Sequence, residues 1–235
     1  MESLIGQFLI STPQMPDPRF QEQVIYLCAH NEAGAMGLVI NNPNPMLTLQ
    51  DVLLNTGIRG EKILSGPVHM GGPVDLNSGF ILYKGTNTTK QYGMEVQAGI
   101  FVSRDSRLLE DIAMGEGPAD FLFILGYAGW GAGQLENELL DNGWLVVPAD
   151  TDIIFRTPAE SKWKQAANKF GIDIVLFGDQ TGNAWAQAPA IVFFFMNTPS
   201  SSHTVSEIFT CARCGFCCQG ETTVSLDTAD QERMI

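Results

Sequence analysis

The sequence predicts an α+β fold, an antiparallel or mixed sheet covered by a few helices. Along residues 1–187, short apolar runs rich in β-branched and aromatic residues are separated by Gly, Pro, Asn and Asp, a pattern typical of many short strands. The regular alternation of strands with long helices that builds a doubly wound parallel sheet does not occur. The 235 residues, of which 45% are hydrophobic, are enough to bury a sizeable core.

Eight runs have the length and composition of strands, and Gly, Pro, Asn or Asp residues punctuate them. They are LIGQFLI (4–10), VIYLCA (24–29), MGLVIN (36–41), GFILY (79–83), GIFVS (99–103), FLFIL (121–125), WLVV (144–147) and DIIF (152–155).

The clearest predicted helix spans residues 157–170. Thr157 is expected to cap it, with Pro158 at the first helical position and Glu160 closing a capping box. One apolar face recurs at helical spacing and leaves the lysines facing solvent. That face consists of Trp163, Ala166, Ala167 and Phe170, and Gly171 ends the helix.

Three further helices are predicted from capping and periodicity. One spans residues 104–114, ends at Gly115, and turns Leu108, Leu109, Ile112 and Ala113 inward. A short helix follows Thr48, where TLQD forms a capping box. Another runs from about residue 133 to 141. These helices are expected to cover the sheet.

The stretch GYAGWGAGQLENEL (126–139) follows an apolar run and precedes a predicted helix, which is the setting of a phosphate-binding loop. The dinucleotide fingerprint fails, because the position of its third glycine is occupied by Gln134, and no Lys followed by Ser or Thr completes a Walker loop. We therefore expect a tight strand-to-helix turn with Tyr127 and Trp130 packed beside it. If a pocket exists there, its candidate residues are Gly126, Trp130 and Gln134.

Other polar residues give weaker signals. Cys28 and His30 are two apart on a predicted strand and could share a face as a thiolate–imidazole pair, although a buried structural cysteine is the simpler interpretation. His69 and Asp17 are expected in turns, because glycine or proline follows them closely. Glu136 and Glu138 point to different sides of their helix. No catalytic residue is predicted.

The charge argues against direct binding to nucleic acid. The formal net charge is −13, from 26 acidic and 13 basic residues, and such a chain is repelled by phosphates. Apolar runs are too short to cross a bilayer and the N-terminal segment lacks the features of a secretory signal. We expect a cytoplasmic protein that does not bind membranes.

Three blocks in order carry a family resemblance: GQFLISTPQMPDPRFQEQVIYLCAHNEAGAMGLVINNP, GGPVDLNSGFILY and GPADFLFILGYAGWGAGQLENELLDNGWL. Over residues 1–187 the chain resembles the AlgH/YqgE family. The resemblance implies a bifurcated mixed sheet folded toward a pseudo-barrel with flanking helices. It implies no established enzyme activity, and one member is named as a transcriptional regulator of alginate synthesis. Ala29 and Tyr83 depart from residues frequent in the family, Glu and His.

The C-terminal segment carries four of the five cysteines: Cys211, Cys214, Cys217 and Cys218. So tight a cluster in a cytoplasmic context predicts metal or redox chemistry, with zinc or iron as candidates. The thiols of Cys211, Cys214 and Cys217, spaced three residues apart, can reach one metal ion. A fourth zinc ligand would have to be Cys218 or His203, and the last cysteine of a ferredoxin-type motif is replaced by Glu221.

This segment also resembles the opening CxxCGxCCxG of the YkgJ family of zinc- or iron-chelating proteins, a family that continues with further cysteines. The expected organisation is an AlgH/YqgE-like domain (1–187), an apolar run with a Ser/Thr/Pro linker (188–206) and an incomplete cysteine-cluster segment (207–235). Met196 is where a separate protein of that kind would begin, so we expect either a natural fusion or two joined reading frames.

Three functional hypotheses remain open. The first is a non-enzymatic binding or regulatory module that acts on transcription indirectly, through protein partners. The second is a metal-binding or redox protein that works through its cysteine cluster. The third is an enzyme with a pocket near GYAGWGAGQLE, acting on an unknown small molecule.

Overall fold

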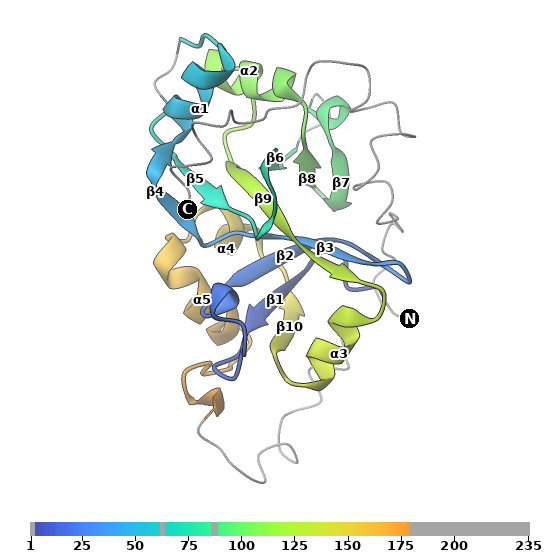
Figure 1. Cartoon of the computed structure of the whole chain (residues 1–235). Coiled ribbons are helices and arrows are strands. Elements are labelled where there is room, and N and C mark those ends of the chain that lie inside the picture. The colour runs from blue at the N-terminus through green and yellow to red at the C-terminus, as the bar shows by residue number, and fades with distance from the viewer. Residues whose placement is uncertain (1–2, 62–63, 86–88, 179–235) are drawn as a thin grey trace.

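The computed structural model describes residues 3–61, 64–85 and 89–178, and these form a ten-stranded sheet flanked by helices (Figure 1). The strands are β1 (Gln7–Ser11), β2 (Val24–Asn31), β3 (Gly34–Val39), β4 (Pro43–Thr48), β5 (Pro67–Met70), β6 (Val74–Lys84), β7 (Met94–Gln97), β8 (Ile100–Ser103), β9 (Phe121–Gly131) and β10 (Trp144–Pro148). The helices are α1 (Leu49–Thr56), α2 (Ser106–Met114), α3 (Gln134–Leu140), α4 (Thr151–Phe155) and α5 (Ala159–Asn168), with 3-10 turns η1 (Pro18–Phe20), η2 (Lys90–Tyr92) and η3 (Leu176–Gly178).

The sheet is mixed and it divides around β9, one of its two 11-residue strands. Its order is β10-β1-β2-β3-β9-β6-β8-β7, with β5 parallel to β9 and β4 antiparallel to β5. The lower half in Figure 1 holds β10, β1, β2 and β3, the upper half holds β6, β8 and β7, and β9 runs through both. This arrangement confirms the predicted α+β class and its curled, largely antiparallel sheet.

Close backbone contact explains the two glycines next to the division. Gly126 has a φ of +68° in the middle of β9, and a Cβ there would lie 2.8 Å from the carbonyl oxygen of Gly72. A Cβ on Gly72, whose φ is +150°, would lie 2.2 Å from the carbonyl carbon of Tyr127. Only glycine fits such a conformation and such an approach. The strand is longer than expected, because β9 continues to Gly131. The expected tight strand-to-helix turn is present at residues 132–133, where Gly133 has a φ of +71°.

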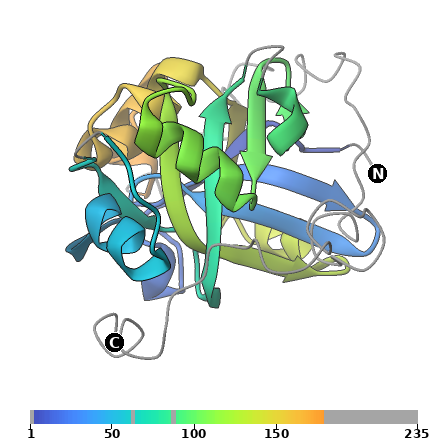
Figure 2. The same cartoon turned by 90° about the horizontal axis from the view of Figure 1, so that it is seen from above.

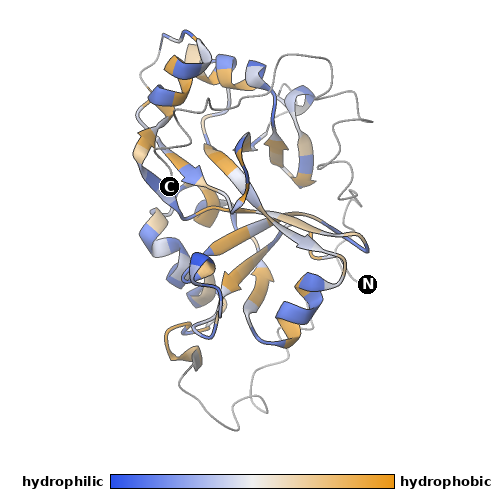
Figure 3. Ribbon diagram, viewed as in Figure 1, coloured by the Kyte–Doolittle hydropathy of each residue, from blue (hydrophilic) through white to orange (hydrophobic). Residues whose placement is uncertain are grey.

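Helices cover the sheet, as expected, and three buried hydrophobic clusters are formed by residues of the strands and helices. Seen from above, α2 lies across β6 and β9 (Figure 2), and its apolar face packs there with α1. The α5 helix packs on β1 and β2, and α3 covers the end of β9. Apolar colour follows the strands, whereas the helices alternate polar and apolar faces (Figure 3).

Two predicted helix ends are confirmed. Thr48 and Asp51 form the capping box at the start of α1, with the Thr48 amide donating to the Asp51 carboxylate. The α2 helix ends at Gly115, in a left-handed conformation at φ +84°. Its buried residues are the predicted Leu108, Leu109, Ile112 and Ala113.

Two assignments near the C-terminal end of the described chain are wrong. Residues 152–155 belong to α4 and not to a strand, because the Asp150 carboxylate accepts the amides of Asp152 and Ile153 and caps a helix. The α5 helix begins at Ala159, with Pro158 as a cap that makes no side-chain hydrogen bond. The Thr157 hydroxyl donates to the Asp152 carbonyl instead, so it closes α4.

The expectation that all lysines of this helix face solvent is also wrong. Lys164 is exposed, but Lys162 is only 2% exposed and its ammonium donates to the carbonyls of Ile40 (2.7 Å) and Ile154 (2.8 Å). Burial lowers the pKa of Lys162 to about 8. The ammonium thereby joins α5 to α4 and to the segment after β3. Across the described ranges, no helix is long and apolar enough to cross a membrane.

Candidate functional site

A cavity of about 300 Å³ lies between the loop that holds η1, the end of β9 and α3. Apolar and aromatic side chains form much of its lining, and acidic groups stand among them. The lining residues are Gln14, Met15, Pro16, Asp17, Arg19, Phe20, Pro73, Ala128, Gly129, Trp130, Gln134, Glu138, Asp141 and Gly143. We refer to this set as the groove.

The η1 wall is fixed by one ion pair. Asp17 caps η1 by accepting the Arg19 amide at 3.0 Å, as expected of a turn-forming residue. Its carboxylate also accepts from the Arg19 guanidinium, with Nη2 and Oδ2 2.6 Å apart. This hydrogen bond lowers the pKa of Asp17 and raises that of Arg19. The guanidinium carbon lies 5.9 Å from the centroid of the Phe20 ring.

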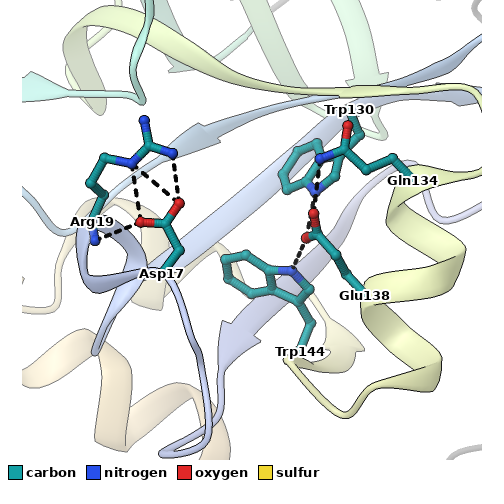
Figure 4. A network of polar contacts seen from close by, with 6 residues as sticks. All are labelled: Asp17, Arg19, Trp130, Gln134, Glu138 and Trp144. Carbon is teal, nitrogen blue, oxygen red and sulfur yellow. Dashed lines mark hydrogen bonds and ion pairs between the residues drawn. The ribbon is translucent and has the colours of Figure 1, made fainter.

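The opposite wall is organised by the carboxylate of Glu138 (Figure 4). Its Oε2 accepts the indole N–H groups of Trp130 at 2.9 Å and Trp144 at 2.8 Å. Its Oε1 accepts from Nε2 of Gln134 at 2.9 Å, and Oε1 of Gln134 accepts the Gly131 amide. The two indole rings meet edge to face, with centroids 6.1 Å apart. All three donors to Glu138 are neutral.

The α3 helix carries this wall because both of its sides are anchored. Leu135 is buried in the cluster between α3 and the sheet. On the other side, the Glu136 carboxylate lies 2.8 Å from Nε2 of His30. Nδ1 of His30 accepts the Leu4 amide, so Nε2 carries the proton and donates. Burial raises the pKa of Glu136, but the hydrogen bond from His30, a backbone hydrogen bond and the electrostatic effect of His30 together outweigh it, and the net pKa is lowered.

The structure places the predicted pocket residues unequally. Trp130 and Gln134 line the groove, whereas Gly126 lies at the bend of β9 and outside the lining. Sequence reasoning missed Glu138 as the organising group and Trp144 as its second donor. The signal for Glu138 was available, because Gln134 and Glu138 are four residues apart on the predicted helix and so share one side of it.

Cys28 and His30 each have a separate partner, which argues against a thiolate–imidazole pair. The pairing of β2 with β3 shifts by one residue between Leu27 and Ala29, so strict alternation of faces fails there. The Cys28 thiol is buried, donates to the Tyr26 carbonyl, and has its pKa raised by burial. His30 is within β2 and bonded to Glu136.

His69 lies on strand β5 and not in a turn. It is 4% exposed, and burial, with a smaller contribution from the charge of Lys162, lowers its pKa to about 4. The described residues contain no group of three or more His, Cys, Asp or Glu placed to hold a metal. Cys211, Cys214, Cys217, Cys218 and His203 lie outside the described residues.

The fold and the groove define a class: an α+β protein with a curled half-barrel sheet, flanking helices and a small aromatic groove at the end of its central strand. A family model described as DUF179, AlgH-like, matches residues 8–175. The chain belongs to this family, so the first resemblance is confirmed. The likeness of the C-terminal segment to the YkgJ family stays a prediction.

Relatives match over nearly their whole length. A UPF0301 protein of Desulfotalea psychrophila is 44% identical over 182 residues, which cover 77% of this chain and 95% of the relative. A UPF0301 protein of Thioalkalivibrio sulfidiphilus is 46% identical over 180 residues, covering 76% and 96%.

Two solved structures share the fold. The solution structure of the AlgH protein from Pseudomonas aeruginosa is 41% identical, with a TM-score of 0.63, and the match covers 77% of this chain and 96% of that one. A crystal structure of a Corynebacterium diphtheriae protein has a TM-score of 0.60 at 18% identity, covering 75% and 92%. That likeness concerns the fold alone.

Proposed function

We propose that this protein is a non-enzymatic binding module that regulates by holding a segment of a partner protein in the groove. The observation that carries the proposal is that the polar side chains of the groove walls are already hydrogen-bonded to one another. Asp17 is bonded to Arg19, and Glu138 is bonded to two indoles and an amide. These contacts fix the position of Phe20, Trp130 and their neighbours before any ligand arrives.

A fixed aromatic surface suits binding more than catalysis. Binding costs less when side chains of the site are already ordered, and buried aromatic anchors dominate many interfaces. Phe20 packs edge to face on Trp144, with centroids 5.6 Å apart, and Trp144 packs on Trp130. The volume is at the low end of ligand sites, roughly 300–1,000 Å³, and it suits one large side chain of a bound segment.

The proposed regulatory role uses the same site. A module that binds a partner segment can change the activity of that partner without contacting DNA, which the net charge of −13 disfavours. We place this action in the cytoplasm, where the four clustered cysteines would stay reduced. Subcellular fractionation of the native host tests that placement.

A selection experiment tests the binding function. A displayed peptide library is selected against the full chain, and the affinities of the selected peptides are measured for the wild type, Phe20→Ala and Leu54→Ala. Phe20 is half-buried in the groove wall, whereas Leu54 is 69% exposed on α1, remote from α3 (Figure 1). We expect Phe20→Ala to weaken binding by about tenfold or more and Leu54→Ala to leave it unchanged. Equal affinities for all three proteins would contradict the proposal.

The spacing of the cysteines supports a second function. We propose that residues 207–235 bind zinc or iron through Cys211, Cys214 and Cys217, with Cys218 or His203 as a further ligand. Elemental analysis of protein purified without oxygen, with and without residues 196–235, tests it. Metal in both forms, or in neither, would contradict it.

A further inference from the structure

The groove has an excess of negative charge on the side of α3. Its lining holds three carboxylates, of Asp17, Glu138 and Asp141, and one cation, Arg19. Arg19 and Asp17 neutralise each other in a two-point ion pair. Within the described ranges, neither Glu138 nor Asp141 forms an ion pair with Lys, Arg or His. Two negative charges are therefore left unbalanced on one wall.

The charge of Glu138 is not balanced by its hydrogen-bond partners. Trp130, Trp144 and Gln134 are neutral donors, so accepting their three N–H groups brings no positive charge to the carboxylate. A half-buried carboxylate costs more to desolvate than an amide. Retaining the charge at this position is favourable if a cation joins it.

The location on α3 strengthens the argument. Glu138 lies in the last turn of the helix, Asp141 is its C-cap, and this turn contains no basic residue. The C-terminal end of a helix already carries partial negative charge, so cations are favoured there and carboxylates are not. Asp141 is exposed and makes no hydrogen bond through its carboxylate within the described chain. The two carboxylates thus lower the stability of α3 when no cation is bound, and they favour the binding of a positive group at this end of the helix.

The aromatic residues around these carboxylates suit the same ligand. The faces of Trp and Phe attract Arg and Lys side chains within about 6 Å of the ring centre. Arg19 already lies in this way over Phe20. Figure 4 shows the Asp17–Arg19 pair and the Trp130–Glu138–Trp144 network on opposite sides, and the cavity of about 300 Å³ lies between them.

We infer that the groove binds an arginine or lysine side chain of the partner segment, with its stem on Phe20 and Trp130 and its charge beside Glu138 and Asp141. This inference rests on the proposed function and specifies the chemistry of the bound segment. Arginine is expected to bind better than lysine, because a planar guanidinium stacks on aromatic rings and donates to two acceptors at once.

A pair of matched peptides tests the inference directly. The probes are acetyl-Leu-Arg-Leu-amide and the same peptide with citrulline, which has the shape of arginine without its charge. Binding is followed through the indole N–H resonances of Trp130 and Trp144, whose protons point to Glu138. We expect the arginine peptide to shift both resonances and to bind about tenfold more tightly than the citrulline peptide at low salt. The preference is expected to shrink as salt is added.

Two variants that remove charge without removing shape complete the test. Glu138→Gln and Asp141→Asn are each expected to lower the affinity for the arginine peptide by about three- to tenfold and to leave the affinity for citrulline unchanged. Asp141 is exposed, so Asp141→Asn keeps the test valid even if Glu138→Gln unfolds the α3 wall. Equal affinity for both peptides, or an arginine preference untouched by Asp141→Asn and by a folded Glu138→Gln, would overturn the inference.

The outcomes separate this inference from the proposed function. One outcome is that library-selected peptides bind the wild type and lose affinity for Phe20→Ala, yet contain no Arg or Lys whose replacement weakens binding. In that case the binding function stands and the cation site is wrong. If no peptide of either kind depends on Phe20, the proposed function itself fails.

Discussion

The buried ammonium of Lys162 makes the free energy of unfolding depend on pH. Its pKa is about 8 in the folded chain, against an ordinary value of 10.5. Between these two values the unfolded chain binds more protons than the folded one, so stability rises with pH. The cost of burying the charge is fully present below about pH 8 and disappears as the pH approaches 10.5.

The perturbation is Lys162→Met, with Lys164→Met on the exposed side of α5 as the matched control. A shift from 10.5 to about 8 corresponds to about 3 kcal/mol in full. From about pH 7 to pH 10, the unfolding free energy of the wild type is expected to rise by about 2 to 3 kcal/mol relative to that of Lys162→Met. The carbonyls of Ile40 and Ile154 lose their donor in the variant, which offsets the whole curve without changing its slope.

The assay is urea unfolding followed by tryptophan fluorescence at several pH values. Cys28 and the buried tyrosines titrate in both proteins, so their effects cancel in the difference. His69, whose pKa is also lowered by the charge of Lys162, has a pKa of about 4 and an ordinary value of 6.5, so its own transition lies below this range. We would regard the reasoning as refuted if the unfolding free energy of the wild type minus that of Lys162→Met stays flat or falls as the pH rises. The same holds if the difference between the wild type and Lys164→Met rises with pH by the same amount.

Three further predictions concern the bend, the core thiol and the C-terminal segment. Gly72→Ala is expected to lower the unfolding free energy by at least about 3 kcal/mol, because of the φ of Gly72 and its close contact with β9. Gly57→Ala, which has open space around it, is expected to lower it by about 1 kcal/mol. Similar losses for the two variants would contradict this packing. With the C-terminal cysteines replaced by serine, Cys28 is expected to react with a thiol reagent only after unfolding, because it is buried and its pKa is raised; rapid reaction of the native protein would count against its burial. Replacing Cys211 and Cys214 by serine is expected to abolish stoichiometric zinc or iron, and unchanged metal content would remove those residues from the site.

Local signals in the sequence predicted much of the fold. The capping box at Thr48 and the apolar face of α2 are confirmed because both depend on residues within one or two turns. The run DIIF was misassigned, since three consecutive apolar residues have the same pattern in a strand and in a short buried helix. The deciding residue was Asp150, whose side chain caps α4.

Contacts between distant segments could not be predicted in the same way. Lys162 looked solvent-exposed because its two carbonyl acceptors, on Ile40 and Ile154, converge only in the folded chain. The groove likewise needs η1, β9 and α3 together, and the pairing of β1 with β10 brings Trp144 into this region. The interval of four between Gln134 and Glu138 places both on one side of the predicted helix, but nothing local points to the opposite wall at Asp17.

The indole N–H resonances of Trp130 and Trp144 offer the most direct measurement of whether the groove is a binding site fixed in advance by Glu138. During titration with a library-selected peptide, both resonances should shift and saturate at one affinity, while signals from α1 remain in place. If the peptide saturates the protein and both indole signals stay unchanged, binding occurs elsewhere and the account of this groove is wrong.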